Sequence, residues 1–292
     1  MDDGPHSEHF SITPIGHIES DYPDKFGVPR QPGLAPAAEA HLVLTPPFND
    51  PLAVRGLEAF SHIWVSFIFH QSPTRWTPLV RPPRLGGNRK VGVFASRSTH
   101  RPNRLGLSLI ALTGVDTSHG VRLQLEGCDL VNGTPVVDIK PYLPWAEARP
   151  DARAGFAPHA PDLLPVHFSQ AAKESLAARA DSASLYALIE QVLGQDPRPA
   201  YQRDAHSERL YGVRLRDVDV KFRAVINPAL QNSASRHSDV KNPGINNPGI
   251  KNADIKDLGS QNSGSQNSSS KDLDAKNSAT TLEVVAVDTF PS

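Results

Sequence analysis

Five short clusters of hydrogen-bonding residues in this sequence could do chemistry. They are VPRQPG (28–33), FHQ (69–71), SRSTHRPN (96–103), DLVNGTP (129–135) and DIKPYLP (138–144). Each lies at the predicted end of a strand or in a turn fixed by Pro or Gly, where side chains can be held rigidly at the rim of a sheet. A single cluster is better explained by turn or capping chemistry, but five in one small region indicate a binding site.

The charged residues are segregated along the chain. The formal net charge is only −1 over 292 residues, yet no Asp or Glu occurs between Ala59 and Val115. The basic residues of that stretch are Arg75, Arg81, Arg84, Arg89, Lys90, Arg97, Arg101 and Arg104. Such a stretch suits an anionic partner such as a phosphate backbone. The alternative is a solvated basic face balanced by acids elsewhere; we favour the anion, because several of these residues adjoin Gly and Pro in loops.

Several classes of function lack their motifs here. The chain has no GxGxxG between a strand and a helix, no P-loop, no HExxH and no GxSxG, which disfavours nucleotide hydrolysis, dinucleotide chemistry and zinc hydrolysis. Cys128 is the only cysteine, so intrachain disulfides and thiolate zinc clusters are excluded, and no metal site is predicted. Its neighbours Leu125 and Leu130 favour a packing role for Cys128 over a nucleophilic one.

The sequence favours a cytoplasmic location. The first residues, MDDGPHSEHF, are acidic and polar and do not resemble a secretion signal. No window is apolar for long enough to cross a bilayer as a helix. We therefore expect a protein of the reducing cytoplasm.

The first half of the chain is predicted to form a β-sandwich or barrel. Apolar and polar residues alternate in short runs. These runs are separated by turn residues and by two loops rich in Pro and Gly, 21–34 and 77–88. The predicted strands are Phe10–Ile18, Ala40–Leu44, His62–His70, Lys90–Arg97, Leu105–Val115, Val121–Gly127 and Pro135–Lys140.

The run HIWVSFIFH (62–70) has one apolar and one mixed face. Alternation predicts a core face made by Ile63, Val65, Phe67 and Phe69. The opposite face combines the apolar surface of aromatic rings with the polar ends of side chains. It suits either the wall of a ligand pocket or a half-exposed strand.

A connector rich in Pro and Ala, 141–165, leads to a predicted α+β domain. Helices are expected over Ser169–Ala180 and from a cap at Ser184 to a stop at Gly194. Strand alternation returns at 210–226 and 281–290, and we expect 281–290 to pair with 218–226.

The segment between those two strands consists of imperfect pentads. Their central positions hold too few large apolar residues for a β-solenoid, so we predict a disordered insert at 228–280 that expands a hairpin loop. Loop closure becomes only slowly more costly with length, so such an insert is tolerable.

Six ordered stretches resemble the TrmO family of tRNA methyltransferases, also called TsaA or YaeB. They are KFGVPRQPGL, RGLEAFSHIWVSFIFHQ, VRPPRLGGN, VGVFASRSTHRPN, DLVNGTPVVDIKPYLP and QDPRPAY. The resemblance implies methyl transfer from S-adenosylmethionine to N6 of N6-threonylcarbamoyladenosine beside the tRNA anticodon (position 37), and a homodimer. The sequence departs from the family pattern in the pentad insert, at Asn132, where Asp is usual, and at Arg104, where Pro often follows the Asn.

We accordingly expect a mainly β protein with three parts. Residues 8–148 are predicted to form an antiparallel β-barrel that binds S-adenosylmethionine and carries the methyltransferase activity. Residues 149–227 and 281–292 are predicted to form the small α+β C-terminal domain, with 228–280 as the insert.

The resemblance also assigns cofactor contacts. They are Pro29, Arg30, Gln31, His70, Gln71, Arg97, Leu107, Asp129, Leu130, Val131 and Asn132. A guanidinium fork, from Arg97 or Arg30, suits the cofactor carboxylate. Turn amides and Gln31 or Gln71 could read the adenine, and apolar Leu107 would flank the rings.

The remaining assignments concern the proton and the tRNA. Asp138 and Tyr142 are the candidate acid/base groups for the N6 proton, with Lys140 lowering a neighbouring pKa or holding an anion. The alternative is that this motif only closes the edge of the barrel. The predicted tRNA contacts are Arg84, Arg89, Arg101 and Arg198.

Two rival hypotheses stay open at the level of sequence. A basic β-barrel could bind RNA without catalysing a reaction, which would explain the acid-free stretch but not the DIKPYLP cluster. A methyltransferase could also act on another acceptor.

Overall fold

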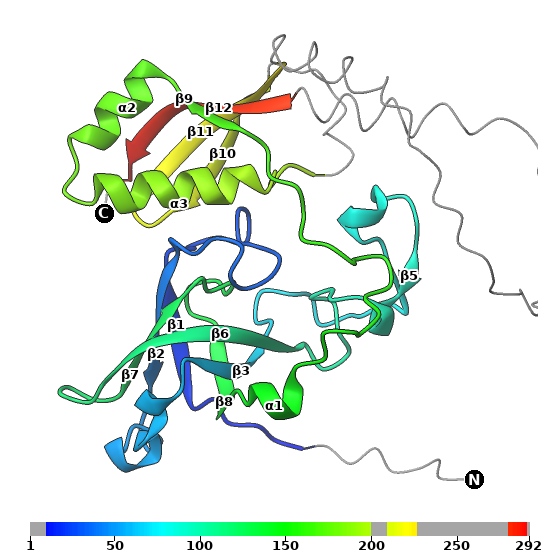
Figure 1. Cartoon of the computed structure of the whole chain (residues 1–292), viewed down its shortest axis with the longest axis vertical. Helices are drawn as coiled ribbons and strands as arrows, with labels where there is room; N and C mark the ends of the chain where they lie inside the picture. Colours follow the sequence, from blue (N-terminus) through cyan, green and yellow to red (C-terminus); the bar gives the residue numbers. More distant parts are fainter. Residues whose placement is uncertain (1–9, 200–208, 227–279, 291–292) are drawn as a thin grey trace, which may run out of the picture.

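The computed structural model describes residues 10–199, 209–226 and 280–290, which form a β-barrel and a second, smaller sheet covered by helices (Figure 1). The strands are β1 (Gly16–Ser20), β2 (Glu39–Leu44), β3 (His62–Ile68), β4 (Leu79–Val80), β5 (Val91–Gly92), β6 (Leu105–Asp116), β7 (Arg122–Glu126), β8 (Pro135–Pro141), β9 (Val166–Phe168), β10 (Tyr211–Leu215), β11 (Val218–Ile226) and β12 (Thr280–Thr289). The α-helices are α1 (Pro144–Glu147), α2 (Gln170–Ala177) and α3 (Ser182–Gly194), and the 3₁₀ turns are η1 (Pro51–Val54), η2 (Leu57–Ala59), η3 (Pro83–Leu85) and η4 (Val93–Ala95).

Six strands close the barrel in the order β1-β2-β7-β6-β3-β8. All its strand pairs are antiparallel, and β8 pairs with both β1 and β3, which completes the ring. The predicted core face of β3 is confirmed: Ile63, Val65 and Phe67 are buried in the barrel interior. The predicted mainly β, antiparallel fold is therefore confirmed. Cys128 is buried in the same interior, as its apolar neighbours indicate.

The predicted strand Lys90–Arg97 is wrong. Only β5 is a strand there; it pairs with β4 outside the barrel, and η4 follows at once. The reason lies in the spacing of the serines. The Ser96 hydroxyl accepts from the Ser98 N–H (3.3 Å) and the Ser98 hydroxyl from the His100 N–H (3.2 Å), so local turns replace a strand ladder.

The predicted strand Phe10–Ile18 is wrong in extent. Pairing begins only at Gly16 and continues to Ser20. Phe10 and Ile12 are exposed, and Pro14 has no N–H to donate to a neighbouring strand. The alternation in residues 10–14 therefore belongs to no strand of the barrel, although the Ile15 N–H donates to the Val136 carbonyl (2.7 Å).

The second sheet has the order β10-β11-β12-β9. β12 pairs with β11 over its whole length, which confirms the predicted pairing of 281–290 with 218–226. The run 210–226, where strand alternation was predicted, forms a hairpin of β10 and β11, and the short parallel strand β9 was not predicted. The insert predicted at 228–280 falls, apart from Thr280, outside the described residues.

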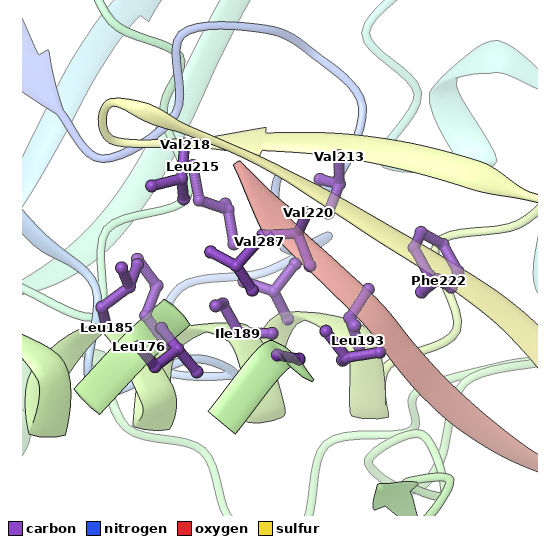
Figure 2. Packing of buried hydrophobic residues seen from close by; sticks show 14 of the residues in the cluster. Leu176, Leu185, Ile189, Leu193, Val213, Leu215, Val218, Val220, Phe222 and Val287 are labelled. Carbon is purple, nitrogen blue, oxygen red and sulfur yellow. The ribbon is translucent and has the colours of Figure 1, made fainter. Parts of the chain in front are cut away.

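Helices α2 and α3 cover one face of this sheet (Figure 1). Figure 2 shows Leu185, Ile189 and Leu193 of α3 directed at Val220 and its neighbours in the sheet. The predicted cap at Ser184 is wrong, because α3 already begins at Ser182. The Asp181 carboxylate makes no capping bond and binds Arg179 and Arg216 instead.

A loop of the barrel half completes the second core. Tyr22, Ala35 and Ala38, between β1 and β2, are fully buried in the cluster formed by the helices and the second sheet. At Gly27, where φ is +94°, a Cβ atom would lie 2.3 Å from Cγ2 of Val213, so only glycine fits this approach. The two β-structures are thus packed together through residues 21–38.

Within the residues that the structure describes, no helix has the length and apolar character to cross a membrane.

Candidate active site

Gln31, Arg97 and Asp129 come together from three loops of the barrel. The guanidinium of Arg97 donates from Nη1 to Oε1 of Gln31, whose Nε2 donates to the carbonyl oxygen of Arg30. The charge of Arg97 also acts on Asp129. Three segments distant in the sequence therefore place an amide, a guanidinium and a carboxylate at one site.

Asp129 is the most unusual group of this site. Its Oδ1 atom is shielded from solvent and has no hydrogen-bond partner among the described residues. Burial raises the pKa of Asp129 to about 6, and the Ser108 hydrogen bond and the Arg97 charge only partly oppose this effect. An unsatisfied, shielded carboxylate oxygen is costly in a folded protein and is characteristic of a site that receives a ligand.

The predicted turn at 129–132 is anchored to the end of β1. Asn132 accepts at Oδ1 from the Ser20 N–H (3.1 Å), and its own N–H donates to the Tyr22 carbonyl (2.8 Å). The Asn side chain thus supplies the acceptor that an Asp would supply. Leu130 is buried in the barrel core and Val131 accepts from the Thr134 hydroxyl at its carbonyl (2.6 Å), so this turn offers backbone groups more than side chains.

His70 and Gln71 follow the end of β3, near the loop that carries Pro29 and Arg30. The Gln71 carbonyl accepts from Nζ of Lys25 (2.8 Å), which joins the two loops. Burial lowers the pKa of His70, and the nearby charge of Lys25 lowers it further. Pro29 is buried, whereas Arg30 and Gln71 are exposed.

Leu107, Ser66 and Asp138 form one row across β6, β3 and β8 on the outside of the barrel. Ser66 is the registered partner of both Leu107 and Asp138. The Leu107 side chain is 57% exposed, an unusual state for a leucine in the middle of a strand. This row brings the predicted apolar cofactor contact and a candidate base onto one surface.

Glu147, a residue that the sequence did not point to, lies beside Lys140 and Trp64. Glu147 of α1 accepts from the Leu143 N–H (3.0 Å) and from Nε1 of Trp64 (2.9 Å), and these bonds lower its pKa. The Lys140 ammonium lies 3.6 Å from the same carboxylate. The Tyr142 ring packs edge-on against Trp64, with 6.1 Å between ring centroids. No motif singles out Glu147; only its closeness to DIKPYLP could have suggested it.

Between β3 and β6, the acid-free stretch forms largely exposed loops that contain β4 and β5. Arg84 donates to the His159 carbonyl, and Arg101 donates to the Ser96 carbonyl (3.1 Å), while Arg89 is exposed. In the described part of the chain, no carboxylate forms an ion pair with an arginine between residues 75 and 104.

Two exposed aromatic residues lie among these arginines. Trp76 is 43% and Phe94 72% exposed, and their ring centroids are 6.4 Å apart. The guanidinium of Arg101 lies 5.7 Å from the Phe94 ring centroid. Unpaired arginines beside exposed aromatic rings can hold phosphates and stack on unpaired bases. Neither ring belongs to one of the five polar clusters of the sequence.

Arg198 does not fit its predicted role. It follows α3, its side chain is 1% exposed, and its Nε donates to Oδ1 of Asp196 (2.7 Å). A guanidinium enclosed in this way and paired with a carboxylate cannot reach a tRNA backbone in this structure. We therefore remove Arg198 from the predicted tRNA contacts and regard it as a structural residue of the second domain.

The described residues bring no three His, Cys, Asp or Glu side chains together as ligands of a metal ion.

Comparisons with known proteins show the family of this chain. The family model of the tRNA-methyltransferase O N-terminal domain matches residues 17–148, and that of the TrmO C-terminal domain matches residues 161–231. The tRNA (adenine(37)-N6)-methyltransferase of Escherichia coli (strain K12) is 50% identical over 218 residues, which are 73% of this chain and 93% of that protein.

A second relative and a solved structure extend the likeness. A Pseudomonas aeruginosa protein named "Putative S-adenosylmethionine-dependent methyltransferase RcsF" is 50% identical over 213 residues, which are 72% of this chain and 90% of that protein. The crystal structure of TrmO from Pseudomonas aeruginosa superposes with a TM-score of 0.62 at 42% identity and covers 74% of this chain and 92% of that one.

Proposed function

The chain belongs to the TrmO family, and from this premise we propose that it is an S-adenosylmethionine-dependent tRNA (adenine(37)-N6)-methyltransferase. In the finer form of the proposal, the acceptor is N6-threonylcarbamoyladenosine and the product carries a methyl group on N6. The observation that carries this proposal is the shielded, unsatisfied Oδ1 atom of Asp129 beside Arg97 and Gln31.

The residues at this site fit S-adenosylmethionine. That molecule has a carboxylate, two cationic centres and an adenine edge. Arg97, with Arg30 nearby, offers a guanidinium for the carboxylate. Asp129 offers a negative charge for a cationic centre, and Gln31 and the backbone of the 129–132 turn offer donors and acceptors for the adenine.

When bound, S-adenosylmethionine supplies an electrophilic methyl group on its sulfonium. The contribution of the protein is to align donor and acceptor and to exclude water, which can be worth roughly 7 to 11 kcal/mol in well-oriented systems. Leu107, exposed on β6 in the same row as Asp138, provides an apolar surface for that purpose.

Removal of the N6 proton falls to Asp138 or Tyr142 in this proposal. Asp138 is exposed on β8, and Tyr142 is positioned at the end of that strand by its N–H bond to the His62 carbonyl (3.1 Å). Lys140 is paired with Glu147, so its role is that of an oriented cation for the threonyl carboxylate or a phosphate.

The tRNA is proposed to lie on the exposed loops of residues 75–104. Arg84, Arg89 and Arg101 contribute positive charge, and Trp76 and Phe94 contribute flat surfaces for unpaired bases. The absence of paired carboxylates among the described residues of these loops supports this placement.

The assembly, the domain limits and the location are also proposals. We propose a homodimer in the cytoplasm, with the barrel domain at 8–148 and the C-terminal domain at 149–227 and 281–292. Light scattering of the purified protein tests the dimer directly.

The decisive experiment is methyl transfer to tRNA that lacks the modification. Incubation with labelled S-adenosylmethionine should place the label in tRNA, and mass spectrometry of the nucleosides should find the threonylcarbamoyladenosine one methyl group heavier. Arg97→Ala should abolish transfer, whereas Arg223→Ala, which removes an ion pair in the second sheet, should keep it.

The outcomes separate the rival hypotheses. Binding of tRNA without any transfer of label would leave only the RNA-binding module. Label in a different nucleoside, or in a small molecule, would keep the methyltransferase but replace its acceptor.

A further inference from the structure

The turn that we assign to the cofactor is held from one side by Ser20 and Tyr22 of a neighbouring segment. The Ser20 hydroxyl donates to the Leu130 carbonyl (2.8 Å), and Ser20 and Tyr22 hold the side chain and the N–H of Asn132. The place of the turn therefore depends on where residues 20–22 lie.

The same short segment is held from the other side by the second domain. Arg216 donates from its backbone N–H to the Asp21 carbonyl (2.8 Å) and from Nε to Oδ1 of Asp21 (3.0 Å). The Tyr22 ring is fully buried in the core under α2 and α3. Residues 20–22 thus form a link with the second domain on one side and the cofactor turn on the other.

Arg216 is itself fixed by several contacts. Its Nη1 donates to the Asp181 carboxylate (3.1 Å) and to the Ser184 hydroxyl (2.9 Å) at the start of α3. The Arg216 and Asp21 side chains are only 16% and 13% exposed. An ion pair with so little exposure, and with these additional hydrogen bonds, is geometrically specific, unlike a surface pair.

The backbone of Arg216 indicates that the side chain has a specific role. Arg216 is in the turn between β10 and β11 with φ of +50°, a left-handed conformation that Gly, Asn and Asp adopt more easily. A residue with a long side chain stays in such a conformation where its surroundings over-determine it. Here the surroundings are Asp21, Asp181 and Ser184.

We propose that Arg216 is a positioning residue for the methyl-donor site. It acts through Asp21 and the Ser20–Tyr22 segment to hold the 130–133 turn in its binding position, so the second domain controls cofactor affinity without touching the cofactor. This inference rests on the proposed function for the identity of the ligand, but the link between Arg216 and the turn stands on contacts alone.

The test uses a variant that suits the backbone. Arg216→Asn keeps a residue that tolerates positive φ while it removes the guanidinium. Hydrogen exchange of the cofactor-free protein should show faster exchange of the Asn132 amide, which donates to the Tyr22 carbonyl, and a smaller change at the Gly133 amide, which donates to Ile18 of β1. The dissociation constant of S-adenosylmethionine by calorimetry should rise by about tenfold, within the range measured for coupling between distant sites.

Controls separate positioning from general stability. Arg223→Asn removes an ion pair with Glu283 in the same sheet (2.8 Å) and should leave exchange at residues 132–133 and cofactor affinity unchanged. Asp21→Asn should reproduce the effect of Arg216→Asn, and the double variant should add little, because both act through one contact.

The inference and the proposed function can fail separately. A folded Arg216→Asn protein with unchanged exchange and unchanged affinity would overturn the role of Arg216. Should that variant not fold, Arg216→Lys, which keeps the charge without the planar fork, must show the same two changes to a smaller degree, and no change would again overturn the role. Failure of the unaltered protein to bind S-adenosylmethionine would instead refute the proposed function, and the exchange result would still report on the link.

Discussion

The barrel half and the second sheet use arginine in opposite ways. In the loops around β4 and β5, most arginines are exposed and none forms an ion pair with a carboxylate of the described residues, and Asp129 keeps an unsatisfied oxygen. In the second sheet and its helices, Arg179, Arg198 and Arg223 each form an ion pair with a carboxylate 2.7 or 2.8 Å away. Paired charges fix a structure, and unpaired ones are available to ligands. The comparison therefore predicts that substitutions in the second sheet, apart from those at the Arg216–Asp21 link, change stability and those in the barrel loops change binding.

The largest expected effect is on stability, at the buried pair of the second domain. Arg198→Ala removes the guanidinium that is buried against the Asp196 carboxylate, and breaking such a pair costs about 3 to 5 kcal/mol. Urea unfolding followed by circular dichroism measures this loss. Arg223→Ala, at a partly exposed pair, should cost less than about 1 kcal/mol. If Arg198→Ala instead weakened tRNA binding with stability intact, the division between the two halves would be wrong.

A smaller effect concerns Asp129 and pH. Its pKa is raised to about 6 by burial, so the free protein is most stable where Asp129 is protonated and loses that contribution as the pH rises from about 4 through about 6. Binding of a cationic ligand needs the carboxylate, so cofactor affinity should change the other way and fall below about pH 6.

Calorimetry between pH 5 and 7.5 measures the affinity, and thermal unfolding without ligand measures the stability, over roughly the range set by that pKa. Asp129→Asn should bind more weakly and flatten both profiles. Parallel pH profiles for this variant and the unaltered protein would show that Asp129 does not face the cofactor.

The smallest expected effect is at an exposed arginine of the barrel loops. Arg89→Ala should reduce tRNA affinity only a few-fold but lower the slope of log affinity against log salt by about one. Binding assays at three salt concentrations give that slope, with Arg223→Ala as the matched control. An unaltered slope would place Arg89 outside the tRNA interface.

Alternation predicted the strands that have one face in a core, and it failed where local side chains compete with the backbone. Ile63, Val65 and Phe67 are recognisable because burial repeats at every second residue. At Ser96 and Ser98, hydroxyl groups bond to nearby amides and remove a strand that the same rule predicts. The alternation of apolar and polar residues does not show that hydroxyl groups compete with a strand for the backbone amides.

The sequence predicted which types of residue form the site, but it did not predict which of them bind a ligand and which support the fold. The clusters around Arg97 and Asp129 stand out because polar residues gather at turns, whereas Glu147 and Trp76 belong to no cluster in the sequence. Arg198 shows the reverse error, since its motif resembles a binding motif and only the fold reveals that Asp196 lies against it. The contact of Glu147 with the distant Trp64 and the burial of Arg198 both arise from the fold, and neither is visible in a linear pattern.

The register of the last two strands has a practical consequence. Ile226 and Thr280 are direct partners at the ends of β11 and β12, so the chain leaves the sheet and re-enters it at adjacent points. A fluorescent protein or an affinity module could be inserted at this junction without separating the two strands, provided that the two termini of the inserted domain lie close together. The same junction would accept a tight engineered turn, which would give a shorter protein for crystallisation.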